Sequence, residues 1–234
     1  MILYIVRHGE PIYGPDTLTE LGQKQAQALV RRFEKSGLDR IFSSPMGRAK
    51  ETAAPACRLL GLDYTIEEWT HEIGDERKTT YPNGEFTSIS NLQNTLFLEN
   101  GGYKLSFEDA YSHPAIAATE MDKACKFIWD NGVDFLARLG YQYEDGIFKI
   151  LQPNEEKVAL FCHAAFSRAW ISMLLRIPLH LAWAGFDYAH TGVTVLEFKN
   201  NPDGYTAPKC LCYSDLSHFY KDGPDMVFNN RVEL

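Results

Sequence analysis

The chain has 234 residues, of which 45% are hydrophobic and 23% charged, so it can bury a sizeable core as a single domain. Its formal net charge of -8 disfavours nucleic-acid and membrane-surface binding, because those partners are themselves anionic. The five cysteines lack the paired spacing of a zinc site or a disulfide framework. The apolar start is too short for a signal peptide, and charged residues interrupt the longest apolar stretch, so a cytoplasmic protein is expected.

The first third of the chain predicts alternating strands and helices. Its opening run is apolar and β-branched, which is typical of a strand buried on both faces of a parallel sheet. Thr19 is a suitable N-cap for the helix that follows, and glycine residues mark the helix ends. The expected elements are a strand over 2–6, a helix from Thr19 to Gly37, a strand over 39–43, and a helix from Ser44-Pro45 to Leu60.

Residues 75–112 are rich in Asn, Gly, Ser, Thr and Tyr, which indicates an insertion instead of core structure. The elements expected after it are a helix over 114–139, a hairpin over 141–150, a strand over 158–162, a helix ending at 177, and strands over 192–198 and 205–213. We therefore predict one domain over 1–234 with a three-layer α/β/α fold and a mostly parallel central sheet. The inserted, cap-like segment covers about 75–112, or extends as far as 155.

Basic side chains and histidines follow the predicted strands. Arg7 and His8 come after the first strand, Arg48 opens the helix after the second, and His163 comes after the strand over 158–162. In an open parallel sheet the ligand crevice lies outside the carboxyl ends of the strands, so these residues should converge there. Arginine donors and a helix start both favour phosphate oxygens. The sequence predicts a pocket that binds phosphate or a similar anion.

The same residues support phosphoryl transfer. A neutral imidazole attacks phosphorus when its other nitrogen is held by a hydrogen bond, and flanking arginines help to keep His8 neutral. Glu72 is the best-placed proton donor, although other acidic residues crowd around it and a solvated loop explains such a cluster as well. With Arg7, Arg48 and His163 stabilising charge, no metal or cofactor is expected. An alternative uses His8, Glu72 and His163 as metal ligands.

Several motifs in this order resemble the histidine phosphatase superfamily, which includes the cofactor-dependent phosphoglycerate mutases. They are Arg7-His8-Gly9-Glu10, Leu18-Thr19-Glu20-Leu21-Gly22, Ser43-Ser44-Pro45, Arg48-Ala49, Thr52-Ala53 and His163. The resemblance implies that His8 is the phosphorylated residue and Glu72 the proton donor. It also implies that Arg7, Arg48 and His163 form the phosphate pocket and that no metal takes part.

The sequence departs from the family pattern at three places. Pro11 stands where a hydroxyl side chain is common, so that phosphate contact is absent or comes from elsewhere, with Thr17 as a candidate. The stretch between Glu10 and Leu18 is short and lacks the pattern of the mutases, which counts against mutase activity. Ala164 replaces a common glycine, but its backbone amide can still bind phosphate at a helix start.

The leading hypothesis is a phosphomonoesterase that hydrolyses a small phosphorylated metabolite through phosphorylated His8. The alternatives are phosphoglycerate mutase-type transfer and a non-catalytic binder of phosphorylated ligands. The insertion is expected to recognise the substrate, but it contains no interpretable motif. No motif indicates the oligomeric state. Four other histidines are interpreted as packing or capping residues: His113, His180, His190 and His218.

Overall fold

The computed structural model of the protein describes residues 1–81 and 83–220. Its centre is a six-stranded sheet in the order β13-β11-β1-β10-β4-β5. β1, β10, β4 and β5 pair in parallel, whereas β11 is antiparallel to both β1 and β13, so the prediction of a mostly parallel sheet is confirmed. The strands are β1 (Ile2–Arg7), β4 (Arg40–Ser43), β5 (Tyr64–Ile66), β10 (Lys157–Cys162), β11 (Val193–Glu197) and β13 (Lys209–Asp215).

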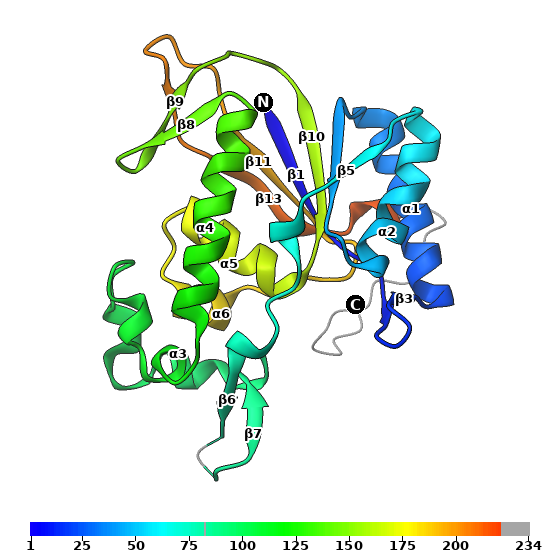
Figure 1. Ribbon diagram of the computed structural model, residues 1–234. Coiled ribbons are helices and arrows are strands. Elements are labelled where there is room, and N and C mark those ends of the chain that lie inside the picture. Colours follow the sequence, from blue (N-terminus) through cyan, green and yellow to red (C-terminus); the bar gives the residue numbers. More distant parts are fainter. Residues whose placement is uncertain (82, 221–234) are drawn as a thin grey trace.

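Helices cover both faces of this sheet, which confirms the three-layer prediction (Figure 1). Alternate residues of β1 enter different cores, because side chains alternate across a strand. Leu3 and Ile5 pack on the face covered by α4 and α5, while Tyr4 and Val6 pack under α1 and α2. The helices are α1 (Glu20–Ser36), α2 (Gly47–Leu60), α4 (Met121–Arg138), α5 (Ala164–Leu174) and α6 (Leu179–Gly185).

The helix ends follow local capping chemistry. The Thr19 hydroxyl accepts a hydrogen bond from the Gly22 amide at 3.0 Å, and Gly37 ends α1, as predicted. The prediction that α2 starts at Ser44-Pro45 is wrong, because α2 starts at Gly47. Ser44 still belongs to the sheet edge, where its amide donates to the Phe161 carbonyl at 2.8 Å.

The single helix predicted over 114–139 is also wrong, since the chain forms α3 (Pro114–Ala117) and then α4. Thr119 causes the break: its hydroxyl donates to the Ile116 carbonyl at 2.6 Å and accepts from the Met121 amide at 3.1 Å. A side chain that bonds nearby backbone groups in this way competes with helix continuation. Similarly, α5 ends at Leu174, earlier than predicted, and the backbone turns through a positive φ of 51° at Arg176.

Smaller strand pairs lie outside the main sheet. The predicted hairpin forms as β8 (Tyr141–Glu144) and β9 (Ile147–Ile150), and β12 (Tyr205–Thr206) joins it in a three-stranded sheet. The strand predicted over 205–213 is therefore divided between two sheets. The remaining pairs are β2 (Pro11–Ile12) with β3 (Thr17–Leu18), and β6 (Lys78–Thr80) with β7 (Phe86–Ser88).

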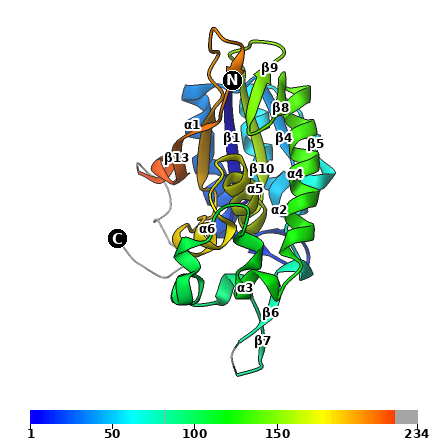
Figure 2. The same cartoon turned by 90° about the vertical axis from the view of Figure 1, so that its left-hand side faces the viewer.

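Residues 75–112 contain β6, β7 and short 3-10 helices, and they lie beyond the carboxyl ends of the parallel strands (Figures 1 and 2). The segment contacts α6 through His180, whose Nε2 donates to the Gly102 carbonyl at 2.8 Å and whose ring stacks on His113 at 5.1 Å. Within the described ranges, no helix has the length and apolar character required to cross a membrane. The 3-10 helices are Glu68–Thr70, Asp75–Arg77, Ile89–Asn91, Asn94–Phe97, Glu99–Lys104, Ala110–Ser112 and Ser217–Phe219.

Candidate active site

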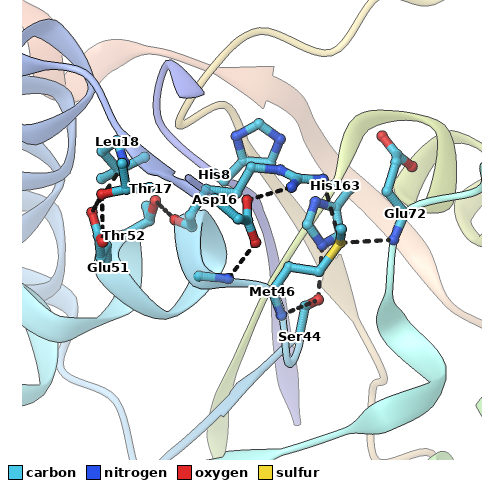
Figure 3. A network of polar contacts seen from close by, with 12 residues as sticks. His8, Asp16, Thr17, Leu18, Ser44, Met46, Glu51, Thr52, Glu72 and His163 are labelled. Atoms are coloured by element: carbon cyan, nitrogen blue, oxygen red, sulfur yellow. Dashed lines mark hydrogen bonds and ion pairs between the residues drawn. The ribbon is translucent and has the colours of Figure 1, made fainter. Parts of the chain in front are cut away.

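The residues predicted to bind phosphate meet at the carboxyl ends of β1, β4 and β10, and Figure 3 shows His8 and His163 there. The rings of His8 and His163 lie 5.1 Å apart between centroids. Both histidines are almost fully buried, as are Arg7 and Arg48. The tertiary structure therefore brings together four side chains that are far apart in the sequence.

The protonation of His8 is fixed by its own turn. Its Nδ1 lies 2.6 Å from the Gly9 carbonyl oxygen, and because a carbonyl only accepts, Nδ1 carries the proton. Nε2 is therefore the basic nitrogen. Burial lowers the pKa of His8 well below its ordinary value of 6.5, and the charge of Arg7 lowers it further. His8 is thus a neutral imidazole with a free lone pair on Nε2.

His163 is held by the loop that follows β4. Its Nε2 lies 2.8 Å from the Ser44 hydroxyl, which also accepts the Met46 amide at 3.3 Å. Its Nδ1 is buried and has no hydrogen-bond partner among the described residues. Burial and the nearby arginines lower the pKa of His163 well below 6.5, so it is also neutral.

Arg7 is anchored from the opposite side of the site by the segment that precedes β11. Its guanidinium donates to the Tyr188 carbonyl and, at 2.9 Å, to His190 Nε2. Burial lowers the pKa of His190 to about 3, so this ring stays neutral and accepts the bond. His190, interpreted from the sequence as a packing or capping residue, thus also has a specific hydrogen-bond partner in Arg7. His190 lies in the site because β11 pairs antiparallel with β1. Next to His190, the Thr191 amide donates to the His8 carbonyl at 3.2 Å.

Arg48 lies in the first turn of α2 and contacts two residues that sequence reasoning did not select. Its Nη1 donates to Asp16 Oδ1 at 2.6 Å, and its Nη2 approaches Met46 Sδ at 3.3 Å. Arg48 Nε is buried without a partner in the described part of the chain. Thr17 is the suggested source of the hydroxyl that Pro11 lacks. Its hydroxyl instead donates to the Glu51 carboxylate at 2.6 Å, outside the cluster.

Glu72 reaches the cluster at the amino-terminal end of α5. Its carboxylate accepts the amides of Phe166 at 3.0 Å and Ala165 at 3.3 Å, and its charge raises the pKa of Arg7 against the effect of burial. The acidic neighbour Glu67 points elsewhere, because Arg138 and Trp69 bind both of its oxygens. Glu72 is thus the carboxylate of this acidic stretch that joins the site.

The remaining candidates lie outside the cluster. His113 and His180 stack beside the segment 75–112, and His218 bonds the Thr191 hydroxyl at 3.1 Å. Ala164 is the first residue of α5, so its amide lies at a helix start as predicted. Over the part of the chain that the structure describes, no three His, Cys, Asp or Glu side chains gather as a candidate metal site.

Sequence comparison identifies full-length similarity to a phosphatase. Residues 3–80 match the profile of the histidine phosphatase superfamily (branch 1). The putative phosphoserine phosphatase 2 of Hydrogenobacter thermophilus is 32% identical over 221 residues, which cover 91% of this chain and 97% of that protein. The probable phosphoglycerate mutase GpmB of Yersinia pestis is 36% identical over only 80 residues, or 30% of this chain and 37% of that protein.

Solved structures share the fold across nearly the whole chain. Phosphoserine phosphatase from Entamoeba histolytica, in complex with 3-phosphoglyceric acid, has a TM-score of 0.59 at 19% identity and covers 93% of this chain and 98% of its own. Mycobacterial glucosyl-3-phosphoglycerate phosphatase with inorganic phosphate has a TM-score of 0.59 at 18% identity, with the same coverage. Together with the matching profile and the full-length relative, this establishes that the chain belongs to the histidine phosphatase superfamily.

Proposed function

We propose that the protein is a phosphomonoesterase that hydrolyses a small phosphorylated metabolite through a phosphohistidine on His8. One observation carries the proposal. His8 Nε2 carries a free lone pair, and the surrounding residues Arg7, Arg48 and His163 each hold a buried nitrogen without a partner among the described residues. Buried polar groups are normally hydrogen-bonded, and a phosphoryl group would satisfy these nitrogens while it presents phosphorus to His8.

In the first step, the His8 Nε2 lone pair attacks phosphorus and the bond from phosphorus to the ester oxygen breaks. Arg7 and Arg48 stabilise the charge on the phosphoryl oxygens. A phosphate oxygen only accepts hydrogen bonds, so His163 would donate from Nδ1 while the Ser44 hydroxyl donates to its Nε2. Glu72 would protonate the leaving alkoxide, which departs as a neutral alcohol.

In the second step, the Glu72 carboxylate takes a proton from water as the water oxygen attacks the phosphohistidine. The bond between nitrogen and phosphorus breaks, inorganic phosphate leaves, and His8 returns as a neutral imidazole. Glu72 Oε2 is suited to this exchange, because its one amide contact is long, at 3.3 Å, while Oε1 accepts the amides of Ile73 and Phe166 at 3.0 Å. Each step uses only these side chains and water.

Small anionic phosphate esters are the substrates to test first. Arg7 and Arg48 are both buried at the cluster, and buried cations of this kind favour an anionic ligand. Relatives named for phosphoserine and glucosyl-3-phosphoglycerate point to the same class.

Phosphatase activity is favoured over mutase activity by the extent of the similarity. The relatives named as phosphoglycerate mutases match only 80 residues, whereas the relative named as a phosphoserine phosphatase matches 91% of the chain. The family profile covers residues 3–80, which include His8, Arg48 and Glu72 but not His163. The two activities are separated by whether water or a second hydroxyl receives the phosphoryl group.

The test is a panel of phosphoserine, phosphoglycerates, sugar phosphates and nucleotides, with release of inorganic phosphate measured for wild type and His8→Ala. We expect release from at least one ester and a loss of about 10⁴-fold or more in His8→Ala, because the variant lacks the proposed nucleophile. Labelled substrate should leave acid-labile label on the wild type alone. Transfer between hydroxyls without phosphate release would identify a mutase, and binding without label would identify a binder.

A further inference from the structure

The loop that contains Asp16 is fastened to the start of α2. The Asp16 carbonyl oxygen lies 2.0 Å from the point where a Cβ on Gly47 would stand, so only glycine allows this contact. The Glu51 carboxylate accepts the Thr17 hydroxyl at 2.6 Å and the Leu18 amide at 3.0 Å (Figure 3). The backbone of Asp16 is thereby held against the first turn of the helix that carries Arg48.

The carboxylate of Asp16 joins Arg48 to its own helix. Oδ1 accepts Arg48 Nη1 at 2.6 Å, and Oδ2 accepts the Gly47 amide at 2.6 Å (Figure 3). The Arg48 side chain is 5% exposed and that of Asp16 is 32% exposed, so the pair is partly shielded from water. Among the described residues, the other polar contact of the guanidinium is the Met46 thioether, which is a weak acceptor.

We infer that Asp16 is the positioning residue for Arg48 in the phosphate pocket, an inference that rests on the proposed function. Arginine has many rotamers, and a bidentate phosphate contact requires a fixed guanidinium plane. Asp16 fixes that plane through Nη1 and leaves the buried Nε without a partner among the described residues. In the alternative, Asp16 is a competing anion that phosphate must displace, but its packing against Gly47 opposes such a movement.

The test measures binding of inorganic phosphate by calorimetry, together with kcat/KM for the best ester, in wild type, Asp16→Ala, Arg48→Ala and the double variant. We expect Asp16→Ala to weaken phosphate binding and to lower kcat/KM by about tenfold each, as for loss of one charge-assisted contact. Asp16→Ala should add almost nothing in the Arg48→Ala background, because Asp16 acts through Arg48. Asp16→Asn, which keeps one acceptor, should recover part of the loss and replaces Asp16→Ala if that variant does not fold.

Thr17→Ala is the matched control. It removes the hydrogen bond from the same loop to Glu51, and this bond does not involve Arg48. An equal loss in Thr17→Ala, or an additive loss in the double variant, would assign the effect to the loop and overturn the inference. Tighter phosphate binding by Asp16→Ala would identify a competing anion instead, and unchanged binding would also overturn the positioning role. These outcomes leave the proposed function intact. A wild-type protein that neither hydrolyses esters nor binds phosphate would contradict both the proposed function and the positioning role of Asp16.

Discussion

At the scale of single residues, the chemistry of the site depends on bonds to groups that take no direct part in it. A backbone carbonyl sets the tautomer of His8, and the Ser44 hydroxyl holds His163. His190 and Asp16 orient the two arginines. Under the proposed function, the nucleophile and the phosphate-binding side chains are held in place before substrate arrives, and such preorganisation supplies much of the catalytic effect of enzyme sites.

The role of Glu72 can be tested by the dependence of rate on the leaving group. Glu72→Gln removes the proton donor but keeps an oxygen that can accept the α5 amides. We expect kcat for an alkyl phosphate ester to fall by about 10²–10⁴-fold, the usual contribution of a general acid. An ester of 4-nitrophenol, which leaves without protonation, should lose much less in burst experiments that isolate the first step. Equal losses for both esters would show that Glu72 is not the donor.

At the scale of elements, close backbone contacts hold the turn after β1. Gly9 and Glu10 pack on the start of α1, where a Cβ on Gly22 would stand 2.2 Å from the Glu10 carbonyl oxygen. The Gly9 amide donates to the Thr52 hydroxyl of α2 at 2.9 Å. Gly9, Gly22 and Thr52 of the sequence motifs therefore serve packing. They allow α1 and α2 to pack closely against the turn after β1.

This packing predicts the effect of adding one methyl group. Gly22→Ala should lower the free energy of unfolding by about 1–3 kcal/mol through overpacking, because the contacting atom belongs to the backbone and cannot rotate away. Gly185→Ala at the end of α6 is the control, since nothing lies within 4 Å of its added Cβ. Urea denaturation of both variants gives the comparison. A Gly22→Ala variant as stable as Gly185→Ala would contradict the close contact.

At the scale of the whole molecule, buried neutral histidines connect parts of the fold that are distant in sequence. Thr191 links the segment before β11 to His218, and a His113–His180 stack joins α6 to the chain around residue 113. Burial lowers the pKa of all these rings and of His8, His163 and His190. The unfolded chain therefore binds protons at mildly acidic pH that the folded protein does not bind.

The free energy of unfolding should consequently fall as the pH drops below 6.5, the ordinary value for histidine, and continue to fall toward the lower folded pKa values. Burial lowers the pKa of His218 to about 4, so His218 alone accounts for a loss of about 1 kcal/mol between about pH 7 and pH 5.5. Denaturation of wild type and His218→Gln at both pH values checks this. The variant should lose correspondingly less stability on acidification, and an identical loss would refute the assignment.

The sequence by itself determined the layered fold, several element boundaries and the histidines and arginines of the cluster. Strand periodicity, helix caps and glycine ends are local signals, so they predicted β1, α1 and the hairpin β8–β9. The rule that ligands bind at the carboxyl ends of parallel strands then placed His8, Arg48 and His163 together. Glu72 also reaches this cluster, although its catalytic role stays a prediction.

Only the tertiary structure decided which groups orient these side chains. His190 contacts Arg7 because an antiparallel strand returns beside β1, and Asp16 contacts Arg48 because a short loop packs on a glycine. No periodic pattern and no fixed spacing in the sequence predicts either contact. Each contact depends on two segments whose paths are set by the rest of the fold. The break after Ala117 has a local origin instead, because the Thr119 hydroxyl bonds the Ile116 carbonyl and the Met121 amide.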